Sequence, residues 1–204
     1  MHPLYKIPLF FAKLIYPCKI YGKENIPKGA AVLTCNHFHA IDCFYVAMAY
    51  NSDISFLAKK ELFKKKGVSR LLKSLGGIPI DRDNPDMKTM LSLMKILKEG
   101  HKLTVFPEGT RNKTGTTELQ PIKGGAVLFA VKTKTPILPV MILKKAKLFT
   151  PNKLIIGEPF TLDEFYDKKL TSDEIDALAE IVSYKMKEQY QILLTKVKRK
   201  KWLS

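Results

Sequence analysis

The chain has 204 residues, of which 46% are hydrophobic, and carries a formal net charge of +16. This length and composition predict one globular domain with a substantial core, and the sequence holds no internal repeat or low-complexity tract. The three cysteines, none in a C-x-x-C pair, support neither a disulfide framework nor a zinc site and favour a reducing compartment. The four histidines lack metal-ligand spacing, so we expect chemistry without a metal or cofactor.

The first twenty residues predict a helix at a membrane surface. Residues 3–20 are rich in apolar and aromatic side chains, interrupted by lysines at intervals of six or seven. The apolar stretch is shorter than the roughly 20 residues that span a bilayer, and it lacks the pattern of a signal peptide. We therefore expect residues 1–20 to form a membrane-interfacial segment, followed by a domain over residues 21–204. A first helix packed on the domain is the alternative. The residues expected in contact with lipid are Phe10, Phe11, Leu14 and Ile15.

Alternating apolar runs and helical patterns follow. The predicted strands cover residues 31–35, 54–58, 77–80, 103–106, 137–143 and 154–156, and the predicted helices cover 41–50, 68–75, 85–99 and 123–132. Strands that alternate with helices predict a single α/β domain whose central sheet is largely parallel or mixed and is flanked by helices. In the helix over 85–99 the spacing predicts a core-facing stripe of Met87, Met90, Leu91, Met94 and Leu97.

The C-terminal segment predicts a long basic amphipathic helix. Residues 173–202 carry apolar side chains at helical spacing and end in a run of cations beside a tryptophan. Such an end fits an anionic bilayer surface, and a helix packed on the domain with a solvated basic tail is the alternative. The residues expected in contact with the membrane are Lys198, Arg199, Lys200, Lys201 and Trp202.

One short segment carries catalytic chemistry. His37 stands five positions before Asp42, where an apolar run gives way to a helical one. A turn there would fold the carboxylate onto the imidazole, which is the base-plus-orienter half of a catalytic triad. No serine or cysteine is placed to complete it, so we expect the nucleophile to arrive with the substrate as a hydroxyl. An N-cap aspartate beside a surface histidine is the alternative. His39 stands at the wrong interval and is interpreted as structural.

Two further segments end predicted strands with an arginine. Residues 106–111 read FPEGTR, and residues 77–82 read GIPIDR. The chain has only four arginines against abundant lysine, so an arginine at a strand end indicates a need for its bidentate geometry. We expect Gly109 to let backbone N–H groups approach an anion, while Thr110 and Arg111 supply a hydroxyl and a guanidinium for a phosphate monoester. A surface ion pair is the alternative for Arg82.

These segments, with TPILPV at residues 135–140, occur in the order of the four motif blocks of the glycerolipid acyltransferases. The resemblance is closest to the lysophosphatidate acyltransferases, covers about residues 21–159, and implies their fold. It implies that His37 is the general base and that Asp42 orients it. It implies that Arg82, Glu108, Gly109, Thr110 and Arg111 hold the acceptor, and that Pro136 and Pro139 lie on the acyl-chain side of the site. Asn112 replaces the serine of many relatives.

The resemblance implies transfer of a fatty acyl group from a thioester, on acyl carrier protein or coenzyme A, to the sn-2 hydroxyl of 1-acyl-sn-glycerol 3-phosphate (lysophosphatidic acid). The product would be phosphatidic acid for phospholipid synthesis. Acylation of glycerol 3-phosphate or another lysophospholipid, and a non-catalytic lipid-binding protein at the membrane surface, are the alternatives. The positive charge fits an anionic membrane or an acidic acyl carrier. No nucleic-acid motif accompanies it, so we expect no nucleic-acid partner and a peripheral or monotopic place on the cytoplasmic face of the membrane.

Overall fold

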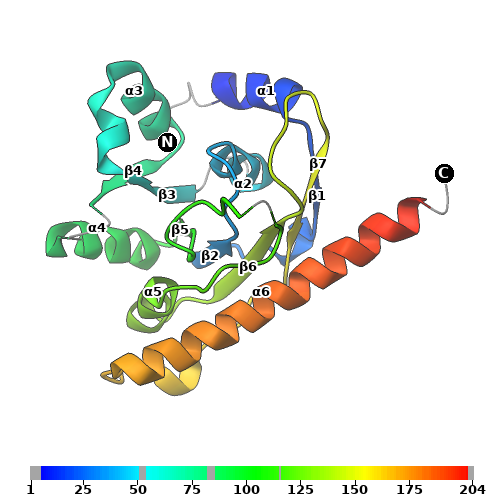
Figure 1. Ribbon diagram of the computed structural model, residues 1–204. Coiled ribbons are helices and arrows are strands. Elements are labelled where there is room, and N and C mark those ends of the chain that lie inside the picture. The colour runs from blue at the N-terminus through cyan, green and yellow to red at the C-terminus, as the bar shows by residue number, and fades with distance from the viewer. Residues whose placement is uncertain (1–5, 51–53, 82–85, 115, 202–204) are drawn as a thin grey trace.

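A seven-stranded sheet forms the centre of the molecule (Figure 1), in the strand order β1-β7-β6-β2-β5-β3-β4. The computed structural model describes residues 6–50, 54–81, 86–114 and 116–201. The five strands from β6 to β4 are parallel, whereas β7 pairs with β6 in the antiparallel sense and β1 is parallel to β7. The predicted single α/β domain with a largely parallel, mixed sheet is therefore confirmed.

The strands are β1 (Cys18–Tyr21), β2 (Ala31–Cys35), β3 (Ile54–Lys59), β4 (Gly77–Ile80), β5 (Lys102–Val105), β6 (Ile137–Ile142) and β7 (Asn152–Ile156). The α-helices are α1 (Lys6–Ile15), α2 (Asp42–Tyr50), α3 (Lys66–Ser74), α4 (Met87–Lys98), α5 (Gly125–Thr133) and α6 (Ser172–Lys201). Short 3-10 helices are η2 (Lys23–Asn25), η3 (Lys60–Lys64) and η4 (Asp163–Phe165).

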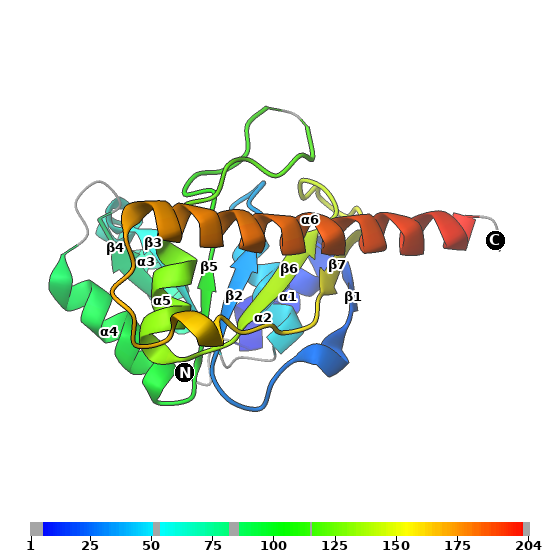
Figure 2. The same cartoon turned by 90° about the horizontal axis from the view of Figure 1, so that it is seen from below.

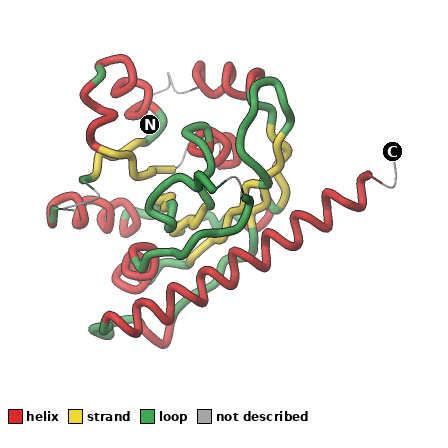
Figure 3. The backbone as a smooth tube through the Cα atoms, viewed as in Figure 1, coloured by secondary structure: helices red, strands yellow, loops and turns green. Residues whose placement is uncertain are grey.

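Helices cover both faces of the sheet because its central strands are apolar on both sides. Every residue of β2, β5 and β6 is buried. One core cluster packs α2 against one face, with α1 outside it, and a second packs α4, α5 and α6 against the other. Figure 2 shows α6 crossing that second face and extending beyond the sheet at its C-terminal end. The loops that follow β2, β5 and β6 gather at the carboxyl edge (Figure 3), where parallel α/β sheets bind ligands.

The N-terminal segment is two elements, not one. Its first part is helix α1, as predicted, but Cys18–Tyr21 forms β1, which pairs with β7 and which the sequence did not predict. One face of α1 packs on the domain through Ala12, while Phe10, Phe11 and Leu14 are 61%, 56% and 58% exposed. The expected division between segments 1–20 and 21–204 therefore cuts through an edge strand of the sheet.

The apolar face of α4 differs from the expected stripe. Met87 and Leu91 are 73% and 58% exposed, whereas Leu93 and Leu97 are buried. Met90 and Met94 pack against the same core, so the inward positions are 90, 93, 94 and 97. This is the i, i+3, i+4, i+7 spacing of a helix that buries one stripe. Met90, Met94 and Leu97 of the predicted stripe therefore face the core, whereas Met87 and Leu91 do not, and Leu93 was missed.

Candidate active site

His37 and Asp42 meet at the carboxyl end of β2, as the sequence predicts. The chain leaves β2, turns, and enters α2 with Asp42 as its first residue. Asp42 Oδ2 lies 2.9 Å from His37 Nδ1 and accepts the backbone N–H groups of Phe38 and His39 at 2.6 and 2.7 Å. The carboxylate is fully buried and the histidine side chain is 12% exposed. Asp42 thus fixes the ring, and Nε2 remains the nitrogen that can take a proton.

The loop after β5 holds the same histidine from two further sides. The His37 ring stacks on Phe106, with centroids 4.1 Å apart and planes 25° from parallel. The His37 N–H donates to Glu108 Oε1 at 2.7 Å, and the Asn112 N–H donates to the His37 carbonyl at 2.7 Å. The first and third motif blocks are therefore one structural unit, in which the ring and the backbone of His37 are both fixed.

Glu108 acts as a brace for this unit. It is 5% exposed, and its second oxygen accepts the Gln120 N–H at 3.2 Å. Burial raises the pKa of the Glu108 carboxyl, although its bonds to the two N–H groups oppose that shift. Both oxygens accept backbone N–H groups, which gives Glu108 a bracing role here, and its contact with the acceptor, implied by the resemblance, stays a prediction.

Asn36 joins the central strands β2 and β6 next to the His37–Asp42 pair. Its side chain accepts the Ile142 N–H at 2.7 Å and donates to the Ile142 carbonyl at 2.9 Å. The amide thus continues the β2–β6 pairing one residue past the end of β2, at a position that is 1% exposed. The sequence contained this residue in the first block but did not predict its role.

A cavity of about 310 Å³ opens over the histidine. Its walls are mainly apolar, and cations with a threonine stand at its rim. The apolar lining residues are Ala40, Cys43, Phe56, Leu57, Ala58, Leu62, Leu72 and Phe106, and the others are His37, Lys59, Thr110, Arg111 and Lys113. An apolar cavity with a cationic rim beside a base suits a lipid that carries an anionic headgroup.

Comparison with known proteins shows the family. The family model described as Acyltransferase matches residues 17–143. The chain is 34% identical over 181 residues to the 1-acyl-sn-glycerol-3-phosphate acyltransferase of Bacillus subtilis, covering 83% of this chain and 86% of that one. It belongs to the acyltransferase family. The expected resemblance is therefore confirmed, and the chain is an acyltransferase enzyme.

Two more relatives support this assignment. The Helicobacter pylori enzyme of the same name is 36% identical over 130 residues, which are 62% of this chain and 54% of that one. The crystal structure of the 1-acyl-sn-glycerophosphate (LPA) acyltransferase PlsC from Thermotoga maritima matches with a TM-score of 0.68 and 28% identity. That match covers 91% of this chain and 79% of that one.

In this acyltransferase Thr110 and Arg111 reach the cavity, whereas Gly109 lies beside it. The Gly109 N–H donates to the Phe106 carbonyl at 3.0 Å, and the approach of other N–H groups of this loop to an anion stays a prediction. The φ of +70° at Gly109 explains the glycine, because other residues rarely adopt that conformation. Gly109 lines a neighbouring apolar cavity of about 260 Å³ instead. Arg82 lies outside the described residues.

The two prolines of the fourth block lie away from the histidine. The Pro136 carbonyl accepts the Val32 N–H at 2.9 Å, which places Pro136 at the amino end of β2. Pro139 is opposite Thr34 and lines a different cavity, under α6. Pro136 therefore lies at the opposite end of β2 from His37, and Pro139, in the middle of β6, lines a cavity whose walls do not include His37. The structure therefore does not bring Pro136 or Pro139 to the acyl-chain side of the His37 cavity.

The rival histidine and the cysteines have structural surroundings. His39 Nδ1 accepts the Ile41 N–H at 3.3 Å, which agrees with the structural role predicted for His39. Cys43 lines the cavity, where its thiol donates to the Ala40 carbonyl at 3.1 Å. Burial, with Asp42 nearby, raises the pKa of Cys43 to about 12, and burial raises that of Cys35 well above its usual value. Neither thiol is therefore ionised at neutral pH, which fits a nucleophile supplied by the substrate.

Lys59 and Lys113 are rim cations that the sequence did not single out. Lys59 is the last residue of β3 and lies 3.7 Å from Glu61, and Lys113 is exposed two residues after Arg111. Nothing in a lysine-rich sequence distinguishes these two from the others. Among the described residues, no group of three histidine, cysteine or acidic side chains is placed to bind a metal.

The chain ends are only partly described. Ile15, expected at the membrane, is half-buried at the end of α1, and Lys198 is exposed near the end of α6. The side chains of Arg199, Lys200 and Lys201, and all of Trp202, lie outside the described residues. Within the described part of the chain, every helix is too short or too polar to cross a bilayer.

Proposed function

We propose that this acyltransferase moves a fatty acyl group from a thioester to the sn-2 hydroxyl of 1-acyl-sn-glycerol 3-phosphate, forming phosphatidic acid. One observation carries the proposal: the bonded His37–Asp42 pair opens into an apolar cavity with Arg111 at its rim. Two relatives that cover most of this chain, from Bacillus subtilis and Thermotoga maritima, are named for acylation of this acceptor.

The reaction follows from the geometry of the dyad. His37 Nε2 takes the hydroxyl proton as the oxygen attacks the thioester carbonyl, and the Asp42 carboxylate stabilises the imidazolium. A C–O bond forms, the C–S bond breaks, and the imidazolium returns the proton to the leaving thiolate. The acceptor's phosphate binds Arg111, with Arg82 as a second candidate, and this contact locates the hydroxyl near His37.

The donor is a thioester of coenzyme A or of acyl carrier protein. Both carry negative charge, which the +16 chain and the lysines at the rim would attract. The acceptor is a membrane lipid, so the enzyme works at an anionic membrane surface, on the cytoplasmic face. The exposed apolar side chains of α1 and the basic end of α6 support this placement.

The test offers the purified full chain a matrix of substrates in lipid vesicles and identifies products by mass. The acceptors are 1-acyl-glycerol 3-phosphate, glycerol 3-phosphate, a lysophosphatidylcholine and a monoacylglycerol, each with acyl-coenzyme A and with acyl carrier protein. We expect phosphatidic acid from the first acceptor and little product from the monoacylglycerol. Turnover of the monoacylglycerol alone would refute the phosphate assignment, and vesicle binding without any product would indicate a lipid-binding protein.

A further inference from the structure

The loop between β6 and β7 presents two large apolar side chains to solvent. Leu148 is 61% exposed and Phe149 is 74% exposed, which makes Phe149 the most exposed large hydrophobic residue in the described part of the chain. Isolated apolar residues are common on protein surfaces, but an adjacent aliphatic and aromatic pair at a loop tip is typical of an interaction site.

The backbone holds Phe149 in this position. Its φ of +51° lies in the left-handed region, which is unfavourable for a bulky aromatic residue. The Phe149 N–H donates to the Ile15 carbonyl at 2.7 Å, and buried Ala146 anchors the loop on the core. The exposure of Phe149 therefore comes from an ordered, locally strained loop tied to the end of α1.

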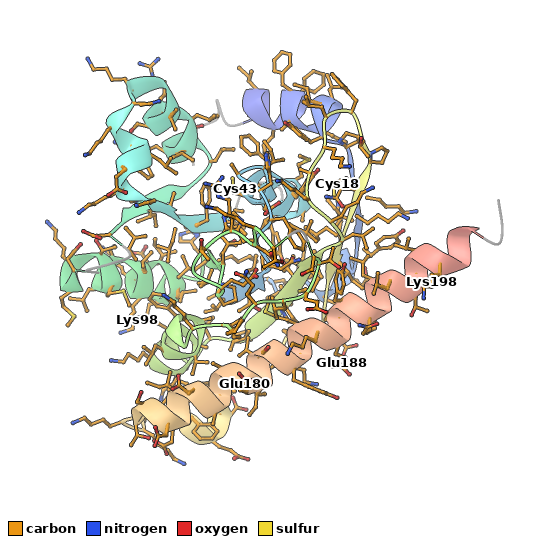
Figure 4. All side chains as sticks on the ribbon, viewed as in Figure 1. Cys18, Cys43, Lys98, Glu180, Glu188 and Lys198 are labelled. Atoms are coloured by element: carbon orange, nitrogen blue, oxygen red, sulfur yellow. The ribbon has the colours of Figure 1, made fainter. Side chains whose placement is uncertain are left out.

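The loop continues the exposed face of α1. Figure 1 shows the loop beside α1 at one end of the molecule, and in Figure 4 side chains of both segments point away from the domain there. The hydrogen bond between Phe149 and Ile15 joins the two segments directly. The exposed large apolar residues of the two segments are Ile7, Phe10, Phe11, Leu14, Leu148 and Phe149.

Charge identifies the partner as an anionic bilayer. Residues 6–15 and 143–151 contain no aspartate or glutamate, while exposed Lys13, Lys144, Lys145 and Lys147 flank the apolar side chains. Apolar tips surrounded by lysines enter the acyl region while the ammonium groups stay at the headgroups.

We propose that the β6–β7 loop is a second membrane-inserting element, in which Leu148 and Phe149 enter an anionic bilayer beside α1. This second contact fixes the orientation of the His37 cavity relative to the bilayer. An enzyme that is held at a membrane by one helix can rotate about the axis of that helix. A second contact beside the helix prevents this rotation. The loop suits this role because it begins directly after Ile142, which is bonded to Asn36 next to the catalytic histidine. The orienting role rests on the proposed membrane function.

The test measures binding of the full chain to vesicles of phosphatidylglycerol and phosphatidylcholine. The variant is Leu148→Ser with Phe149→Asn, since asparagine tolerates the left-handed backbone and the fold should be kept. The matched control is Met87→Ser with Leu91→Ser, which removes two equally exposed apolar residues from α4. We expect partitioning at least about tenfold weaker for the loop variant and unchanged for the control, as the lost apolar burial implies. Equal binding of wild type and loop variant would overturn the proposal.

A second measurement places the loop directly. Phe149→Trp in a Trp202→Phe background should show a blue-shifted emission with these vesicles and quenching by brominated lipid chains. Emission unchanged by vesicles would overturn insertion. A wild-type dimer that the loop variant dissociates would assign the surface to a second copy instead.

Activity separates this proposal from the proposed function. The loop variant should transfer acyl groups to a water-soluble short-chain acceptor at the wild-type rate and lose rate on membrane-embedded acceptor. Equal rates on membrane-embedded acceptor for variant and wild type would overturn the orienting role. Failure of the wild type to transfer to any acceptor would instead refute the proposed function, while the vesicle measurements would still decide insertion.

Discussion

At the scale of residues, the central feature is how Asp42 serves two purposes with one oxygen. Its Oδ2 accepts two backbone N–H groups of the turn and faces His37 Nδ1, so the fold of the turn and the orientation of the His37 ring depend on the same atom. Because the turn holds this carboxylate against Nδ1, Asp42 is placed to stabilise an imidazolium when Nε2 takes a proton. An alternative in which Asp42 only caps α2 does not account for these contacts.

The pKa of Cys43 gives a prediction about the nucleophile. The thiol has a pKa of about 12, so the thiolate is a trace species at neutral pH. Cys43→Ser should leave kcat/KM nearly unchanged, and alkylation of Cys43 should stay slow at a pH where an ordinary thiol is half ionised. Steady-state kinetics and mass spectrometry check both. Loss of transfer in a folded Cys43→Ser enzyme would instead indicate an acyl-cysteine intermediate.

Arg111 allows the phosphate assignment to be tested without removing charge. Arg111→Lys keeps the cation but loses the bidentate fork, so we expect a higher KM for the phosphate-bearing acceptor and an unchanged KM for the donor. The matched control is Lys113→Arg, at the same rim, which should change neither constant much. Equal damage to both substrates in Arg111→Lys would mean that the arginine has a structural role.

The sequence predicted those site residues whose partners are local. His37 and Asp42 lie five positions apart across one strand–turn–helix, so their contact follows from local geometry. The brace made by Glu108 could not be predicted, because one of its partners is 71 positions away and the choice between acceptor and backbone depends on tertiary packing. Pro136 was misplaced because a motif does not state which edge of the sheet it occupies.

At the scale of elements, the junction of β2 and β6 depends on Asn36. Asn36→Ala would leave the N–H and the carbonyl of Ile142 unpaired in the core, at a cost of about 1–3 kcal/mol for each buried group. We expect urea unfolding to show a loss of about 2–6 kcal/mol in the free energy of unfolding. Asn25→Ala is the control, since that part-buried amide makes one bond, to Ile156, and should cost less. Equal losses would show that the two bonds between Asn36 and Ile142 stabilise the fold no more than the single bond of Asn25 does.

Strand β1 is an element that could not be predicted from the sequence. Its four residues are too few to display a period, and its partner β7 begins at Asn152, far along the chain. The longer elements, such as α6 and the buried strands β2 and β6, carry enough apolar residues to be recognised from spacing alone. Truncation of residues 1–20 would therefore cut through β1 and leave only Tyr21 of that strand, so membrane binding is better tested by substitutions within α1.

At the scale of the whole molecule, membrane binding should have two separable parts. Replacing Phe10, Phe11 and Leu14 by Gln should weaken the binding that survives high salt, because apolar burial does not depend on ionic strength. Replacing Lys198, Arg199, Lys200 and Lys201 by Gln should remove mainly the salt-sensitive part, at roughly 1 kcal/mol for each cation near the surface. Vesicle flotation at low and high salt distinguishes the two. Full binding in high salt without the α1 side chains would mean that α1 does not anchor the enzyme.

In the proposed reaction, His37, oriented by Asp42, is the base that activates the acceptor hydroxyl. The most direct measurement is the rate of phosphatidic acid formation from 1-acyl-glycerol 3-phosphate and an acyl thioester, followed by mass for wild type, His37→Ala and His39→Ala. We predict a loss of about 10²–10⁴-fold for His37→Ala, with unchanged thermal unfolding, and a far smaller loss for His39→Ala. Wild-type rates in a folded His37→Ala enzyme, or a folded but inactive His39→Ala enzyme, would show that His37 is not the base.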